Sequence, residues 1–322
     1  MKTFRLIGMA LLAVVMCVNF TSCSNEDSVP ETPKDCIVSL SFKGDIINTV
    51  ESPLTRAESN DLYYITVSFG KEDGYASYAY GLFDDVSAMK IKLTSKQKYI
   101  FNAIIVKNGK EKVHHTNQTY SAPFNCDLNN EFIYEKNSRF DDSIFTLSDG
   151  ENYRIPNIDF YISPNGTEYT PVENGNVSIY MLRHSFGAKF IADNLTEGSL
   201  KIALLCDDPH YGQCKSPTIS IDYPNTTVED IFMLSPSSEV DTEVSDLMDK
   251  LKVSLVWVKG DGTETELGTP VITFRRNKLT TITVRVDKST ENGISFGYYE
   301  SEEMGDGGSY IVDGNDVSTT EE

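Results

Sequence analysis

Residues with catalytic or metal-binding side chains are scarce in this sequence, and positive charge is in short supply. The 322 residues include four His and one Trp, and 28 Lys and Arg stand against 48 Asp and Glu. A chain with a net charge of −20 is not attracted to phosphates, so nucleic acid is a poor partner. The HExxH and P-loop motifs are both absent. We therefore expect a non-enzymatic protein with no cofactor and no bound metal.

No apolar run is long enough for a permanent transmembrane helix, which needs about 20 residues. The run from Leu6 to Val18 has 13 residues, and positive charges precede it while Thr21-Ser22-Cys23 follows it. This order is typical of a secretory signal, here residues 1–22. A cysteine directly after small residues predicts a lipoprotein, so we expect a lipid anchor on Cys23. The alternative is a soluble secreted protein with an incidental cysteine, since Phe20 replaces the usual Leu.

A short polar segment, residues 23–35, separates the signal from the first predicted strand. It begins with the acidic stretch Ser24-Asn25-Glu26-Asp27 after Cys23 and contains Pro30 and Pro33. The acidic stretch resembles the surface-export tag of lipoproteins in gut and oral anaerobes, which predicts a location on the outer face of the cell outer membrane. An ordinary solvated linker is the alternative for the same composition.

Besides Cys23, the mature chain holds the cysteines Cys36, Cys126, Cys206 and Cys214. An exported protein folds in a compartment where disulfides persist. Cys206 and Cys214 flank a turn-rich segment that one bridge would close, although four cysteines allow three pairings. A zinc site is the other interpretation, but the sequence has no CxxC and no neighbouring His at ligand spacing.

Short alternating apolar runs dominate the mature chain, and turn signals such as Asn-Gly and Asp-Gly separate them. Alternation with a period of two residues, together with many β-branched and aromatic side chains, predicts half-buried strands. The runs lie at 37–42, 62–69, 98–106, 132–134, 177–182, 188–192, 200–205, 253–258 and 280–286.

Many short strands predict an all-β fold of two β-sandwich domains. We place these domains at residues 36–174 and 175–288, followed by an acidic tail rich in Gly and Ser at 289–322. One or two short helical insertions are expected. The apolar residues of Glu239–Leu251 have helical spacing, and acids just after Thr227 suit the first turn of a second helix.

Three segments together resemble the fimbrillin superfamily, the pilus subunits and related surface lipoproteins of gut and oral anaerobes. They are Ser52–Ala57 with Asp61–Ile65, Tyr78–Asp85, and Phe274–Lys278. The resemblance implies two transthyretin-like β-sandwich domains, lipoprotein export and, for pilus subunits, assembly by donor-strand exchange. In that assembly an extended segment of one subunit fills an open sheet edge in the next. The implied partners are the outer-membrane lipid anchor, other fimbrillin-type subunits, and a host or glycan ligand.

In this family the missing strand is made by proteolysis, often after an arginine in the loop that follows the first strand. Arg56, followed by Ala57, lies in the polar segment Asn48–Asn60 between two predicted strands. Cleavage there would release the first strand together with its lipid. The alternative is an uncut loop, which suits an anchor, tip or stand-alone lipoprotein. The tail likewise has two interpretations, a donor segment or plain disorder.

Two further patterns bear on binding. Tyr75, Tyr78 and Tyr80 are predicted to share one face of a strand, either as cross-strand packing or as contacts for a glycan. Asp84-Asp85 is predicted to be a solvated turn, with calcium as the alternative.

The first functional hypothesis is a fimbrillin-like surface lipoprotein, in adhesion or as an accessory, tip or anchor subunit of a pilus. The second is a non-catalytic glycan-binding lipoprotein of a polysaccharide uptake system.

Overall fold

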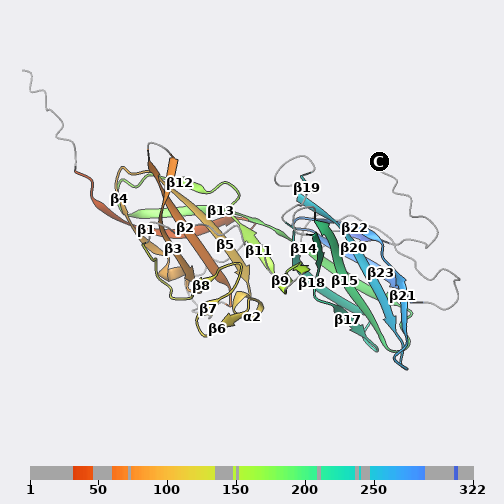
Figure 1. Cartoon of the computed structure of the whole chain (residues 1–322). Coiled ribbons are helices and arrows are strands. Elements are labelled where there is room, and N and C mark those ends of the chain that lie inside the picture. The colour runs from red at the N-terminus through yellow and green to blue at the C-terminus, as the bar shows by residue number, and fades with distance from the viewer. Residues whose placement is uncertain are drawn as a thin grey trace, which may run out of the picture. The chain divides into compact units, whose positions relative to one another are not determined.

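The computed structural model describes residues 32–45, 60–71, 74–134, 148–149, 152–208, 212–235, 239–240, 247–286 and 308–310. Residues 35–322 belong to one compact unit. Strands dominate it (Figure 1), and the helical elements described are the short η1 (Val86–Ala88) and α2 (Gly109–Lys112). The predicted all-β class is therefore confirmed. None of the described helices is long and apolar enough to cross a membrane.

The first half of the unit is built on a single large sheet. Its strand order is β3-β2-β5-β11-β13-β1-β4, and β12 pairs with β5 outside this path. The strands are β1 (Asp35–Gly44), β2 (Leu62–Lys71), β3 (Gly74–Phe83), β4 (Lys90–Thr94), β5 (Tyr99–Lys107), β11 (Asp159–Ile162), β12 (Thr167–Tyr169) and β13 (Gly175–Arg183).

This sheet curls around its own core. The backbone N–H of Lys92 in β4 donates to the hydroxyl of Tyr134 at 3.0 Å, and its carbonyl accepts from the hydroxyl of Tyr78 in β3 at 2.9 Å. Since β3 and β4 are the two ends of the strand order, these contacts link opposite edges of the sheet. The hydroxyls also satisfy backbone groups that an edge strand otherwise exposes to pairing with other chains.

The other face of the same sheet carries a second cluster of buried residues. Leu62, Tyr64 and Ile104 pack there against Tyr120 and Phe124 from the following loops. Those loops contain a small three-stranded sheet of β6 (His115–Thr116), β7 (Thr119–Tyr120) and β8 (Cys126–Asp127). The small sheet thereby covers apolar surface that the large sheet would otherwise expose.

The second half of the unit consists of two further sheets. The larger has the order β19-β20-β15-β16-β10-β9, with β17 paired to β15 and both β21 and β22 paired to β20. The smaller has the order β18-β14-β23-β24. The strands are β9 (Ser148–Asp149), β10 (Asn152–Arg154), β14 (Ser185–Asp193), β15 (Ser199–Asp208), β16 (Gly212–Lys215), β17 (Ile219–Asp222), β18 (Thr227–Met233), β19 (Glu239–Val240), β20 (Leu247–Val258), β21 (Glu264–Gly268), β22 (Val271–Arg275), β23 (Leu279–Arg285) and β24 (Gly308–Tyr310).

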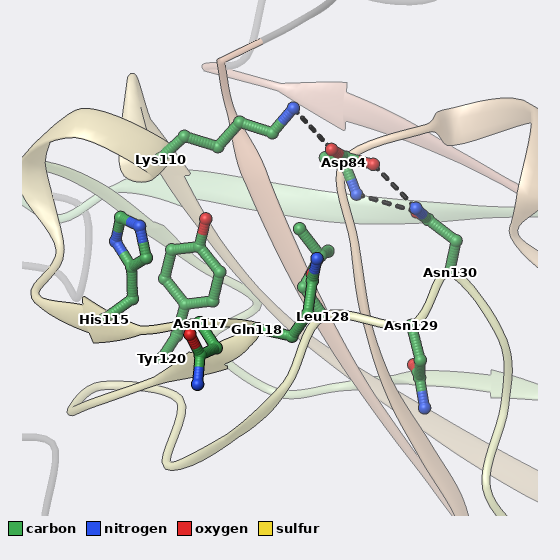
Figure 2. Close-up of a pocket in the computed structure, with 9 residues that line it drawn as sticks. All are labelled: Asp84, Lys110, His115, Asn117, Gln118, Tyr120, Leu128, Asn129 and Asn130. Atoms are coloured by element: carbon green, nitrogen blue, oxygen red, sulfur yellow. Dashed lines mark hydrogen bonds and ion pairs between the residues drawn. The ribbon is translucent and has the colours of Figure 1, made fainter.

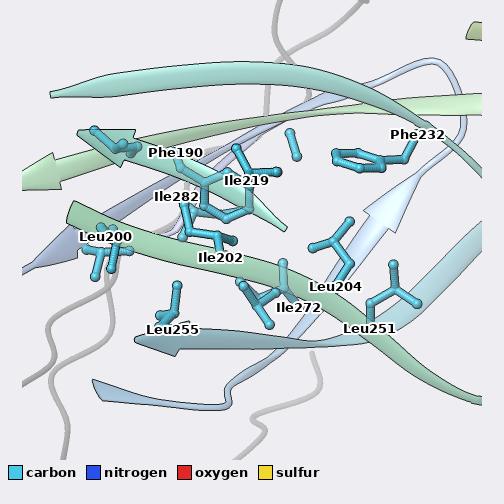
Figure 3. Packing of buried hydrophobic residues seen from close by; sticks show 14 of the residues in the cluster. Phe190, Leu200, Ile202, Leu204, Ile219, Phe232, Leu251, Leu255, Ile272 and Ile282 are labelled. Atoms are coloured by element: carbon cyan, nitrogen blue, oxygen red, sulfur yellow. The ribbon is translucent and has the colours of Figure 1, made fainter. Parts of the chain in front are cut away.

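These two sheets share one apolar core, as a sandwich does. Figure 3 shows Phe190 and Ile282 of the smaller sheet facing Ile202, Leu255 and other side chains of the larger one. Fully burying side chains of this size contributes roughly 1.5–3 kcal/mol each. The alternating runs at 188–192, 200–205, 253–258 and 280–286 form the strands that the sequence predicts there.

The two predicted helices are wrong at the residues that the structure describes. Thr227–Met233 is the strand β18, and Leu247–Leu251 belongs to the long strand β20. In β20 the buried side chains alternate, with Asp249, Leu251 and Val253 pointing inward. β20 pairs with both β15 and β22, and pairing between distant segments overrides the local helical spacing. Residues 241–246 lie outside the described residues.

Cys206 and Cys214 face each other in the register of β15 and β16 and form a disulfide, with their Cα atoms 5.0 Å apart. Cys36 and Cys126 are thiols. The other two pairings that the sequence leaves open are therefore absent from this structure.

The strand pairing changes from one half to the other at His184. β13 pairs with β1 and β11, whereas β14, which begins at Ser185, pairs with β18 and β23. The domain limits at 174 and 288 stay predictions. Within the predicted tail, Gly308–Tyr310 forms β24 and pairs in parallel with β23.

Candidate functional site

Strand β1 occupies the interior of the first sheet. It pairs in parallel with β13 on one side and antiparallel with β4 on the other. Its inward residues Cys36, Val38, Leu40 and Phe42 are all buried, while Ile37 and the polar residues between them face outward. This strict alternation is what the sequence predicts for a strand with one core-facing side. A single strand therefore supplies one wall of the first core.

The segment that follows β1 carries the predicted maturation site. β1 ends at Gly44 and β2 begins at Leu62. Arg56 and Ala57 lie between them, outside the described residues, as does the predicted lipidation site Cys23. All three therefore stay predictions.

The carboxylate of Asp45 is held at the end of β1 by groups from distant parts of the chain. It accepts a hydrogen bond from the backbone N–H of Arg183 at 3.0 Å and forms an ion pair with Arg276. Arg276 also donates to the backbone carbonyl of Arg183 at 3.2 Å. The end of β1 is thus fixed to the last residue of β13 and to the turn after β22.

A second carboxylate completes this group of charges. The guanidinium of Arg183 donates through Nε and Nη2 to the two oxygens of Asp159, each at 2.7 Å. Bidentate pairs of this kind are the stronger form of charge-assisted hydrogen bond. We call Asp45, Asp159, Arg183 and Arg276 the junction cluster, because it lies where the strand pairing passes from the first half to the second.

His184 lies beside the junction cluster and is buried. Burial, together with the positive charge of Arg276, lowers the pKa of His184 from 6.5 to about 4. Its Nδ1 atom is buried without a hydrogen-bond partner among the described residues. The imidazole is therefore neutral at pH 7, and a proton on it would oppose the charge of Arg276.

The three tyrosines proposed as a glycan platform do not share one face. Tyr78 packs against Tyr99 and the first core, with ring centroids 5.1 Å apart. Tyr80 packs against Tyr64 on the opposite face of the sheet. The register between β2 and β3 shifts next to Tyr78, because a β-bulge there turns the following residues over. Tyr75 is 48% exposed, and its role as a glycan contact stays a prediction.

A polar pocket lies where the small sheet meets the end of β3 (Figure 2). Its volume is about 540 Å³, within the range of small-molecule sites. It is lined by Asp84, Lys110, His115, Asn117, Gln118, Tyr120, Leu128, Asn129 and Asn130. Asp84 directly follows β3, Lys110 lies in α2, and the other residues come from the small sheet and its flanking loops.

The charged residues of this pocket are held in one network. Asp84 accepts from Lys110 at 2.5 Å through one carboxylate oxygen and from the amide of Asn130 at 2.7 Å through the other. The amide oxygen of Asn130 accepts in turn from the backbone N–H of Asp84 at 2.9 Å. Asn130 has a positive φ of 56°, which Asn tolerates better than most residues. The paired charges leave the pocket polar without a large net charge.

Two aromatic rings form the other side of the pocket. His115 and Tyr120 stack with their ring centroids 4.7 Å apart. Burial raises the pKa of Tyr120, so its hydroxyl stays protonated at neutral pH and can donate a hydrogen bond.

The sequence analysis did not predict this pocket, although the Asn residues in the stretch 117–130 are a signal for it. Asp85 forms a turn contact, because its carboxylate accepts from the backbone N–H of Ser87 at 2.8 Å. Asp84 is not a solvated turn residue, since its side chain is bound to Lys110 and Asn130. No group of three His, Cys, Asp or Glu residues in the described part is placed to hold a metal ion.

Comparison with known proteins gives similarity at the level of solved structures. A candidate adhesin from Bacteroides thetaiotaomicron has a TM-score of 0.40 and 12% identity, over 87% of this chain and 98% of that one. The fimbrial anchor protein Mfa2 from Porphyromonas gingivalis has a TM-score of 0.35 and 11% identity, over 83% and 96%. A candidate polysaccharide-binding protein from Bacteroides thetaiotaomicron has a TM-score of 0.40 and 11% identity, over 79% and 93%.

The descriptions of these proteins thus name an adhesin, a fimbrial anchor protein and a polysaccharide-binding protein. No protein-family model and no curated protein matches the chain.

Proposed function

We propose that the protein is a fimbrillin-like surface lipoprotein, anchored in the outer membrane through lipid on Cys23. It acts in adhesion or as an accessory, tip or anchor subunit of a pilus assembled by strand exchange. In this role it binds and assembles and has no catalytic function.

The observation that carries the proposal is the position of β1. β1 is a complete strand that follows the predicted lipid-bearing segment, and it lies between β13 and β4. Its loss would open a groove lined by apolar residues and leave backbone groups on both neighbours without partners. An extended segment of another subunit restores those hydrogen bonds and refills the core, which is the energetic basis of strand addition.

Lipid anchoring and strand removal are competing fates, since Cys23 and β1 lie on the same side of Arg56. Mass spectrometry of the protein recovered from intact cells distinguishes them. An acylated Cys23 on an uncut chain is expected for an anchor, tip or stand-alone lipoprotein, whereas a chain that begins at Ala57 is expected for a polymerising subunit.

Variants make this experiment decisive. Cys23→Ala is expected to release the protein from the membrane fraction, and Arg56→Ala to abolish any chain that begins at Ala57. Lys43→Ala, which changes an exposed basic residue of β1, is the matched control for cleavage. A Cys23→Ala protein that remains bound to the membrane would contradict the lipoprotein proposal.

The polar pocket favours a second candidate function, a non-catalytic glycan-binding lipoprotein. Sugar hydroxyls donate and accept hydrogen bonds at once, and the amides of Asn117, Gln118 and Asn129 can do the same. Asp84 adds an acceptor, and Tyr120 adds a donor beside an aromatic face. The matched charges of Asp84 and Lys110 suit an uncharged ligand better than an ion.

This candidate function predicts a selective loss of binding. In a binding assay on immobilised neutral oligosaccharides, Asp84→Asn and Gln118→Ala are each expected to weaken binding at least tenfold. Asp193→Asn, at an exposed ion pair with Arg285, is the control and should bind as the unchanged protein does. If Tyr75→Ala abolishes binding while the two pocket variants keep it, the exposed tyrosine is the glycan contact and the pocket is not.

A further inference from the structure

Gly44 and Asp45 are the last described residues before the segment that carries the predicted cleavage site. Their conformation and contacts differ from those of an ordinary strand end. Gly44 has a φ of 102°, in the region that favours glycine. A Cβ atom at this position would lie 2.3 Å from the carbonyl oxygen of Met181 and 2.9 Å from the ring of Tyr180. The chain can pass this point against β13 only with glycine at residue 44.

The turn at Gly44 brings Asp45 to a defined place. Its backbone N–H donates to the carbonyl of Met181 at 3.0 Å. Its carboxylate then meets the backbone N–H of Arg183 and the guanidinium of Arg276. Asp45, directly after β1, therefore contacts the second half of the unit through Arg276, and its position depends on the glycine before it.

The groups that contact Asp45 favour an acid over a neutral polar side chain. The side chain of Arg276 is only 10% exposed, and a buried guanidinium is costly unless a carboxylate neutralises it. The neighbouring Arg183 already has its own acid, because both oxygens of Asp159 are bound to it. A strand that placed a neutral residue beside Arg276 would leave more of this positive charge uncompensated.

We propose that Gly44 and Asp45 form an end-stop that sets which strands can occupy the β1 position and in which register. The proposal rests on the proposed function, since it concerns strands that replace β1. It identifies the partner by its chemistry: an extended segment with four alternating apolar residues, then a polar residue, a glycine and an acid. The apolar residues fill the core, and the Gly-acid pair fixes the register, which alternation alone leaves open to slips of two residues.

Strand exchange into the full mature chain tests this. A specific protease site is introduced within residues 46–59, and the folded protein is cut there so that β1 stays in place without a covalent link. Labelled peptides of residues 34–47 are then added under mildly denaturing conditions and the denaturant is removed. Native mass spectrometry measures the fraction of the protein in which a labelled peptide has replaced β1. The peptides carry the natural sequence, Asp45→Asn, Gly44→Ala, or Asp35→Asn.

The two ends of β1 provide the comparison. Asp35 also forms an ion pair, with Lys92 at 2.6 Å, but both side chains are exposed. The Asp35→Asn peptide is therefore expected to replace β1 as well as the natural one. The Asp45→Asn and Gly44→Ala peptides are expected to do so at least tenfold less well.

Other outcomes separate the two proposals. Equal incorporation of all four peptides would overturn the end-stop while leaving strand replacement intact. If the natural peptide itself never replaces β1, strand replacement fails, and the end-stop fails with it. A second measurement uses the uncut chain: Asp45→Asn should speed hydrogen exchange of the β1 amides, whereas Asp35→Asn should not.

Discussion

Replacing Asp159 with alanine is expected to lower the free energy of unfolding by about 3–5 kcal/mol, the range for breaking one side of a buried ion pair. The side chains of Arg183 and Asp159 are only 12% and 14% exposed. Loss of the carboxylate removes both acceptors of a bidentate pair and leaves the guanidinium of Arg183 in a site that water reaches poorly. The cost is therefore mainly that of an uncompensated charge.

Urea unfolding, followed by the fluorescence of Trp257, measures this loss. Asp35→Ala is the matched control, because it breaks the exposed pair with Lys92 and exposed pairs contribute about 0–1 kcal/mol. A loss below about 1 kcal/mol for Asp159→Ala would mean that Arg183 is adequately solvated, contrary to the low exposure of the pair.

The second large effect concerns pH. The pKa of His184 falls from 6.5 in the unfolded chain to about 4 in the folded one. The unfolded state therefore binds a proton more readily, so the contribution of His184 is complete above pH 6.5 and is lost as pH falls toward 4. A difference of this size corresponds to roughly 3 kcal/mol of unfolding free energy.

Carboxylates also titrate at acid pH and change the stability. The test therefore compares how the free energy of unfolding depends on pH in two proteins. The free energy of unfolding is measured from pH 7 to pH 4.5 for the natural chain and for His184→Phe, which has no titrating group at this position. The natural chain is expected to lose more stability over this range. Parallel curves for the two proteins would show that His184 is protonated in the folded state without cost, and that Arg276, Arg183 and the carboxylates of Asp45 and Asp159 balance its charge.

Local patterns predicted the strands well where one face is buried and the other is not. The run Ile37–Phe42 alternates because its even-numbered residues enter the core, and it forms most of β1. The same rule failed at Leu247–Leu251, where apolar residues at adjacent positions imitate helical spacing. There the buried residue Asp249 accepts from the backbone N–H of Ser235 through one carboxylate oxygen and from its hydroxyl through the other. No local pattern contains that contact.

The prediction for the tyrosine cluster was wrong for a different reason. The prediction that Tyr75, Tyr78 and Tyr80 share a face assumed an unbroken period of two residues. A single bulge beside Tyr78 sends Tyr78 and Tyr80 to opposite faces of the sheet. Bulges arise from the fit between two strands, so one strand read alone does not reveal them.

The sequence by itself determined the all-β class, because the alternation of apolar and polar residues can be recognised within each strand alone. The order of residues along the chain also predicts a secretory signal and a lipid anchor on Cys23, and these predictions need no fold. Only the tertiary structure decided which charges meet. Asp45 and Arg276 are 231 positions apart, and their pairing depends on β1 lying beside β13 and on the turn after β22. Contacts between segments so distant leave no periodicity in the sequence, since folding alone brings them together.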